Sequence, residues 1–164
     1  MLHRNLVSIG ALLVPSLIAI APSDAQLNID IEQPPIEYSE TPDDNQVSRL
    51  IEKIKSREIK LKYNEETGYL PSLLEALDIP IASQVLVFSK TSLQVRYISR
   101  RNPRAIYFND DTYVGWVRGS SLMEISTSDP KLGAAFYTVE MKPWRPDIER
   151  AYYDCLSCHT TSMT

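Results

Sequence analysis

The sequence AIYFNDDTYVGWV, residues 105–117, decides the fold of this chain. Two runs rich in aromatic and β-branched residues, 105–108 and 112–117, flank the polar triplet Asn109-Asp110-Asp111. Asn and Asp favour tight turns because their side chains hydrogen-bond to the backbone two residues further on. The stretch therefore predicts an antiparallel β-hairpin.

Apolar runs on both sides of this hairpin extend the β pattern. Residues 85–88 are apolar on both faces, as in a central strand, and Leu93, Val95 and Tyr97 alternate with polar residues, as in a half-buried strand. We expect two more strands at 122–126 and 134–141, separated by a turn at 129–131. Together these segments predict a small antiparallel meander of about five strands, with a helix or two packed on one face.

Helical patterns lie before and after the meander. Residues 41–44, TPDD, have the hydroxyl cap, the first-turn proline and the acidic residues typical of a helix start, and we expect this helix to end near Lys62. A shorter helix is expected at 70–77, since Pro80 forbids its continuation. A last helix is expected to begin near Asp147. The predicted fold class is therefore α+β, with a C-terminal helix.

Composition excludes several classes of protein. The chain has 164 residues, of which 43% are hydrophobic and 23% charged, which is enough for one domain with its own core. Two cysteines cannot make a disulfide scaffold, and five glycines include no phosphate-binding fingerprint. The net charge of −4, without any run of Lys or Arg, gives no reason to expect a nucleic-acid partner.

Residues 1–25 have the layout of a secretory signal peptide: a short basic start, an apolar stretch, and a polar end. A membrane anchor is the alternative, but the apolar stretch is interrupted by Pro15 and is shorter than the roughly 20 residues of a membrane span. Residues 26–40 are polar, contain Pro34-Pro35, and are interpreted as an extended leader. We therefore expect an exported, periplasmic protein with a single domain at 41–164 and no membrane span after cleavage.

The sequence Cys155-Leu156-Ser157-Cys158-His159 is the c-type haem attachment motif. Its spacing lets Cys155 and Cys158 reach the two vinyl groups of a porphyrin while the imidazole of His159 meets the iron. Once residues 1–25 are removed, His159 is the only histidine left. The motif therefore predicts one covalent haem c, with Cys155 and Cys158 holding the cofactor and His159 holding the metal.

The motif also permits three other interpretations. Cys155 and Cys158 could form a simple disulfide or a thioredoxin-like redox pair, although Pro143 and Pro146 stand where a thioredoxin-like motif would need a strand. A zinc ion would find two thiolates and one imidazole, with only a carboxylate such as Asp154 nearby to complete a tetrahedral site.

The sequence does not identify the ligand on the distal side of the iron. Met123 and Met141 would have to come from the sheet, Lys142 is another conceivable donor, and Met163 follows His159 too closely to reach the opposite haem face.

A basic cluster, Arg100, Arg101 and Arg104, could pair with haem propionates, but a solvated loop is the expectation we favour.

The five-residue motif resembles the attachment site of the cytochrome c superfamily, and the resemblance implies covalent haem with His159 as the proximal ligand. Residues 68–159 are also similar to the N-terminal part of a poorly characterised family of exported bacterial haem c proteins. The segments that carry this likeness are 68–71, 86–94, 103–110, 113–117 and 129–133. In that family the chain continues well beyond the first motif, which implies a longer protein with one or several haems.

These patterns favour an electron carrier, or the haem-binding part of a larger redox protein with a protein redox partner, over a stand-alone enzyme. An open sixth iron position would instead permit chemistry on peroxide or a gas. The alternative from another class is a non-haem β-rich binding module closed by a Cys155–Cys158 disulfide. Its candidate contact residues are aromatic: Tyr107, Tyr113, Trp116 and Trp144.

Overall fold

A computed structural model describes residues 31–152, 155–156 and 159. The predicted signal peptide, the first residues of the predicted leader, Asp154, Cys158 and Met163 lie outside the described residues. Within the described part of the chain, no helix is long and apolar enough to span a bilayer.

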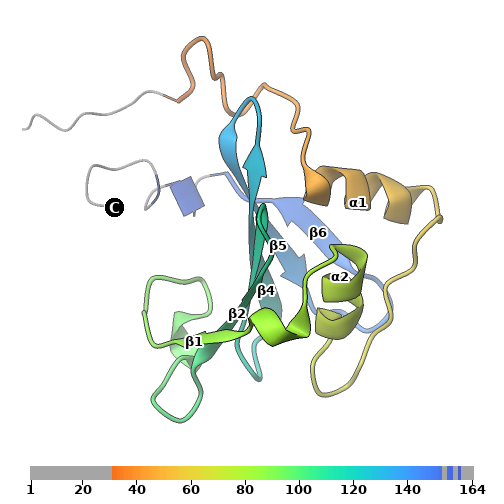
Figure 1. Cartoon of the computed structure of the whole chain (residues 1–164), viewed down its shortest axis with the longest axis vertical. Helices are drawn as coiled ribbons and strands as arrows, with labels where there is room; N and C mark the ends of the chain where they lie inside the picture. Colours follow the sequence, from red (N-terminus) through yellow and green to blue (C-terminus); the bar gives the residue numbers. More distant parts are fainter. Residues whose placement is uncertain (1–30, 153–154, 157–158, 160–164) are drawn as a thin grey trace, which may run out of the picture.

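The strands form one six-stranded antiparallel sheet in which each strand pairs with the next one along the chain (Figure 1). The strands are β1 (Val85–Val87), β2 (Arg104–Phe108), β3 (Thr112–Trp116), β4 (Leu122–Asp129), β5 (Gly133–Glu140) and β6 (Asp147–Arg150). The helices are α1 (Gln46–Lys55) and α2 (Leu70–Ala76), and two short 3₁₀ turns are η1 (Ile81–Ser83) and η2 (Val95–Tyr97).

The hairpin predicted at 105–117 is confirmed as β2 and β3. Its turn forms as the sequence predicts, because Asn109 Oδ1 accepts hydrogen bonds from the backbone N–H groups of Asp111 at 3.1 Å and Thr112 at 2.8 Å. Just inside the turn, the paired residues Phe108 and Tyr113 stack with ring centroids 5.7 Å apart. The predicted segments 122–126 and 134–141 correspond to β4 and β5.

Side chains alternate across the sheet, so its two faces differ in character. On one face, here called the helix face, β3 and β4 present Val114, Met123 and Ile125, all of them buried. Helices α1 and α2 lie on this side (Figure 1) and contribute Leu50 and Leu73 to the same core. The opposite face, here called the open face, has neither helix over it.

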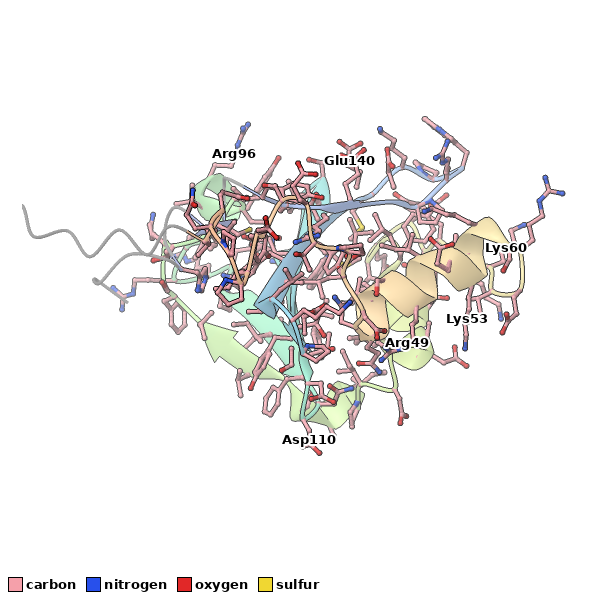
Figure 2. The ribbon with its side chains drawn as sticks, turned by 90° about the horizontal axis from the view of Figure 1, so that it is seen from above. Arg49, Lys53, Lys60, Arg96, Asp110 and Glu140 are labelled. Atoms are coloured by element: carbon pink, nitrogen blue, oxygen red, sulfur yellow. The ribbon has the colours of Figure 1, made fainter. Side chains whose placement is uncertain are left out.

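Helix α1 is shorter than predicted. It begins after Asn45, whose Oδ1 accepts hydrogen bonds from Val47 N at 3.0 Å and Ser48 N at 2.9 Å, while Ser48 Oγ accepts from Asn45 N at 2.9 Å. This capping box outcompetes the Thr41-Pro42 start. The helix ends near residue 56 rather than 62, because Arg57 takes a left-handed conformation with φ of 63°. Figure 2 shows Arg49 and Lys53 of α1 pointing away from the sheet.

The predicted α+β fold class with a C-terminal helix is wrong. The described elements end with β6, which occupies residues 147–150 where that helix was expected to begin. The cause is tertiary: β5 has a free edge, and Val139 pairs with Ile148, whose side chain packs on the core. In the part of the chain that the structure describes, the result is a six-stranded antiparallel sheet with the two short helices α1 and α2, and with helical conformation at Cys155, Leu156 and His159.

Two strand predictions before the hairpin are also corrected. Residues 85–87 form an edge strand rather than a central one, with Val85 and Leu86 exposed. Residues 95–97 form the 3₁₀ turn η2 rather than a strand. In both places the hydrophobic pattern predicted burial that the sheet does not provide.

The described part of the predicted leader is anchored to β6 by Arg150. The Arg150 guanidinium donates to Tyr38 O at 2.7 Å and Thr41 O at 3.1 Å, and it lies 4.6 Å from the ring centre of Tyr38 and 4.8 Å from that of Tyr152. Tyr38 is buried and donates to Ala134 O at 3.0 Å. This packing was not anticipated from a polar, proline-containing segment.

Candidate functional site

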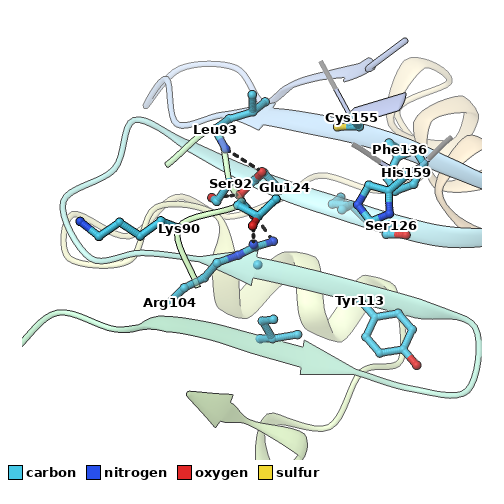
Figure 3. Close-up of a pocket in the computed structure, with 14 residues that line it drawn as sticks. Lys90, Ser92, Leu93, Arg104, Tyr113, Glu124, Ser126, Phe136, Cys155 and His159 are labelled. Carbon is cyan, nitrogen blue, oxygen red and sulfur yellow. Dashed lines mark hydrogen bonds and ion pairs between the residues drawn. The ribbon is translucent and has the colours of Figure 1, made fainter. Parts of the chain in front are cut away.

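The open face of the sheet holds a pocket with a volume of about 740 Å³ (Figure 3). Register brings its floor together: Tyr113, Ser126 and Phe136 form one row across β3, β4 and β5, and Gly115 and Glu124 belong to the next row. The remaining lining residues come from β2, β4, the loop before η2 and the C-terminal segment: Arg104, Ile106, Ile125, Lys90, Thr91, Ser92, Leu93, Cys155 and His159.

The C-terminal segment supplies one wall of this pocket. Leu156 is buried in the core, and the two residues Cys155 and His159 line the pocket. The His159 ring lies over Phe136, with centroids 4.7 Å apart and planes tilted by 30° (Figure 3). Two of the three predicted site residues therefore share one pocket, and the third, Cys158, lies outside the described residues.

The loop before η2 supplies the opposite wall and is held by Glu124. The Glu124 carboxylate accepts hydrogen bonds from Ser92 Oγ at 2.5 Å and Leu93 N at 3.0 Å (Figure 3). It also accepts one from Gln94 Nε2 at 2.8 Å. Gln94 is fully buried, donates to Gly115 O at 3.0 Å and accepts from Val117 N at 2.8 Å. These bonds fix the loop to β3 and β4.

Arg104 is the buried cation of the pocket. Its side chain is 17% exposed, and its guanidinium lies 3.5 Å from a Glu124 oxygen and donates to Thr91 O at 3.3 Å. The Nε atom is buried and has no hydrogen-bond partner among the described residues. A Cβ on Gly115 would come within 2.6 Å of Nε, so the glycine lets the guanidinium lie against the sheet.

The predicted basic cluster divides accordingly. Arg104 belongs to β2 and lines the pocket, whereas Arg100 and Arg101 are exposed in the preceding turn. The expectation of a solvated loop therefore holds for Arg100 and Arg101 and is wrong for Arg104.

The candidate distal ligands are not brought to the pocket. Met123 is fully buried on the helix face, so the sheet itself separates it from His159. Met141 packs beside Gly68, and Lys142 Nζ pairs with Glu140 and, at 3.5 Å, with Asp147. The two methionines that the sequence offered from the sheet, Met123 and Met141, therefore serve packing.

The aromatic contact candidates also divide into two groups. Tyr107 is buried and Trp116 is partly buried against the core. Tyr113 is 49% exposed at the pocket, and Trp144, in the connection between β5 and β6, is 82% exposed.

The roles of Glu124, Gln94 and Phe136 in the pocket were not predicted from the sequence. One signal was present, since Glu124 lies between Met123 and Ile125 in a predicted strand, which places an acidic residue on the face opposite the core.

Comparisons with protein-family models, curated proteins and solved structures found no match for this chain. Its functional interpretation therefore rests on its own residues.

Proposed function

We propose that this chain is an exported c-type cytochrome-like protein that binds one covalent haem through Cys155, Cys158 and His159 and transfers electrons to or from a redox partner protein. The observation that carries the proposal is that Cys155 and His159, four residues apart, line one pocket on the open face of the sheet.

The residues present fit such a group. Haem c is a flat, largely apolar macrocycle that carries two carboxylates. The pocket offers apolar side chains, among them Leu93, Ile106 and Phe136, and a buried cation, Arg104. Its volume of about 740 Å³ is within the range of small-molecule and cofactor sites. When bound, the haem supplies a one-electron iron couple.

The protein's own part is to present three side chains in the right order. The thiols of Cys155 and Cys158 would each add across one vinyl double bond, which forms two thioether bonds with no net oxidation. Leu156, the residue after Cys155, is buried and anchors the segment to the core. Phe136 limits the orientations open to the His159 ring because it packs against one face of it.

Coexpression with a haem-attachment system tests the proposal. We expect the wild-type protein to stain for haem peroxidase activity on a denaturing gel and to gain the mass of one haem. Cys155→Ser and Cys158→Ser should each lose a thioether, and the double variant should not stain. Ser157→Ala changes only the variable part of the motif and is the matched control, which should stain like wild type.

The competing disulfide gives the opposite result in the same experiment. An unstained wild-type band whose mass is lower by two hydrogens would show that Cys155 and Cys158 are joined to each other, and the haem proposal would then fail.

A further inference from the structure

Arg104 keeps hydrogen-bonding capacity that its neighbours do not use. Its Nε is buried without a partner among the described residues, and its two recorded contacts, to Thr91 O and Glu124, are 3.3 and 3.5 Å long. Charge-assisted hydrogen bonds are usually about 2.7–2.9 Å long. A cation that is only 17% exposed and is held this loosely is costly unless an anion completes its surroundings.

Glu124 does not complete them. Its two oxygens already accept three hydrogen bonds of 2.5 to 3.0 Å from the loop residues Ser92, Leu93 and Gln94. Its contact with Arg104 is longer than all three. The carboxylate therefore serves chiefly to fix the loop. The buried Nε of Arg104 faces Gly115, but its two Nη groups carry four N–H donors and make only two contacts among the described residues, so they have donors left for a further acceptor in the pocket.

The position of Arg104 relative to the motif suits an amphipathic ligand. The guanidinium lies over Gly115 of β3, and His159 lies over Phe136 of β5. These two positions are two strands apart across the sheet and one row of side chains apart along the strands. By strand spacing and rise per residue, these two points on the sheet are about 12 Å apart. A ligand held at Cys155 and His159 would cross the part of the floor that β4 contributes, Ser126 and Glu124, and would have its far edge near Arg104.

We infer that Arg104 binds one carboxylate of the ligand in this pocket, so that the site recognises a flat apolar molecule with an acidic edge. This inference rests on the proposed function, in which that carboxylate is a haem propionate. Arg104 is thus a binding residue for the cofactor's acidic edge, separate from the attachment motif.

The test uses the full chain purified without a haem-attachment system, titrated with iron-free protoporphyrin IX and with its dimethyl ester. The two probes share the macrocycle and differ in whether the carboxylates are free. We expect wild type to bind the free acid at least about tenfold more tightly than the ester, and Arg104→Met to lose this preference. Arg104→Lys should restore part of it, since the charge returns without the fork geometry.

Arg101→Met is the matched control, because it removes an exposed arginine just outside the pocket. It should keep the wild-type preference, and circular dichroism should show that all variants are folded. Equal binding of acid and ester by wild type, an unchanged preference in Arg104→Met, or no binding of either porphyrin would each overturn the inference. The haem stain on coexpressed protein reports separately on the proposed function, so the two failures are distinguishable.

Discussion

The two faces of the sheet each bury an arginine, and the two arginines are held differently. Arg150 lies on the helix face, where its partner across the strands is the buried Tyr137. It donates to two carbonyl oxygens at 2.7 and 3.1 Å and lies against the rings of both Tyr38 and Tyr152. Its Nε also has no partner among the described residues, but two rings and two hydrogen bonds hold its guanidinium.

Among the residues that the structure describes, no aromatic ring packs against the guanidinium of Arg104 on the open face, and its two contacts are longer. The contrast shows why an unpaired donor alone is a poor sign of a binding site. The sign becomes informative when the whole guanidinium is loosely held and also lines a pocket. We therefore propose that Arg150 serves the fold and Arg104 serves the site.

The largest effect is expected for Arg150→Met. The substitution leaves Tyr38 O and Thr41 O without their donors and removes two cation–π contacts, so the free energy of unfolding should fall by about 3 kcal/mol. Arg104→Met, with longer contacts, should cost only about 1 kcal/mol. Urea unfolding of both variants beside Arg101→Met measures the difference. If Arg104→Met proves as destabilising as Arg150→Met, the proposed division of roles is wrong.

The next effect concerns Asp129, a buried acid that is the last residue of β4 and lies on the helix face of the sheet. Burial raises the pKa of its carboxyl, but hydrogen bonds from Asn45 and from the backbone N–H groups of Lys131, Asp44 and Leu132 outweigh burial and leave the pKa below its ordinary value of 3.8. A depressed pKa contributes stability above the ordinary value, and that stability is lost as the pH falls through the folded-state pKa.

Asp129→Asn should therefore lower the free energy of unfolding by about 2 kcal/mol at neutral pH. The variant should also lose less stability than wild type between about pH 5 and about pH 2. Thermal unfolding across this range measures both effects, with the exposed Asp110→Asn as control. Parallel curves for wild type and Asp129→Asn would contradict the prediction.

The sequence predicted those parts of the fold that have local causes. The hairpin turn follows from Asn109 alone, and β4 and β5 follow from alternation within each segment. Strand β6 was missed because residues 147–150 become a strand only when the edge of β5 is available to them. The α1 start was misplaced because Asn45 is also held by Asp129 and Tyr137, which are remote in sequence.

The candidate site divides in the same way. Cys155 and His159 were singled out from the sequence because both belong to one five-residue motif. The wall that faces them was not, since Glu124, Gln94 and Phe136 meet only through strand register and a buried hydrogen-bond network. Arg104 was grouped with its neighbours in the turn, and only its place in β2 distinguishes it from them.

A smaller effect is expected for Glu124→Gln, which tests the open-face network. An amide offers the loop one uncharged acceptor in place of a carboxylate, so the free energy of unfolding should fall by about 1 kcal/mol and amide hydrogen exchange at residues 92–94 should quicken. The preference for free-acid porphyrin over its dimethyl ester should rise, because Arg104 no longer shares the pocket with an anion. Glu149→Gln, exposed on β6, is the control. A weaker preference for the free acid would contradict this account.

The smallest effect on stability, but a distinct effect on binding, is expected for Gly115→Ala. The added methyl would lie 2.6 Å from both Nε and Nη2 of Arg104, which is too close, and the guanidinium must move because it is the flexible partner. Since alanine is tolerated in a strand at least as well as glycine, unfolding should change by no more than about 0.5 kcal/mol. The preference for free-acid porphyrin should nevertheless fall severalfold. Ser126→Ala, on the same floor, should leave it unchanged. If Gly115→Ala keeps the full preference for the free acid over the ester, the position of the guanidinium over this glycine does not matter for binding. Arg104 would then, like Arg150, serve the fold and not the site.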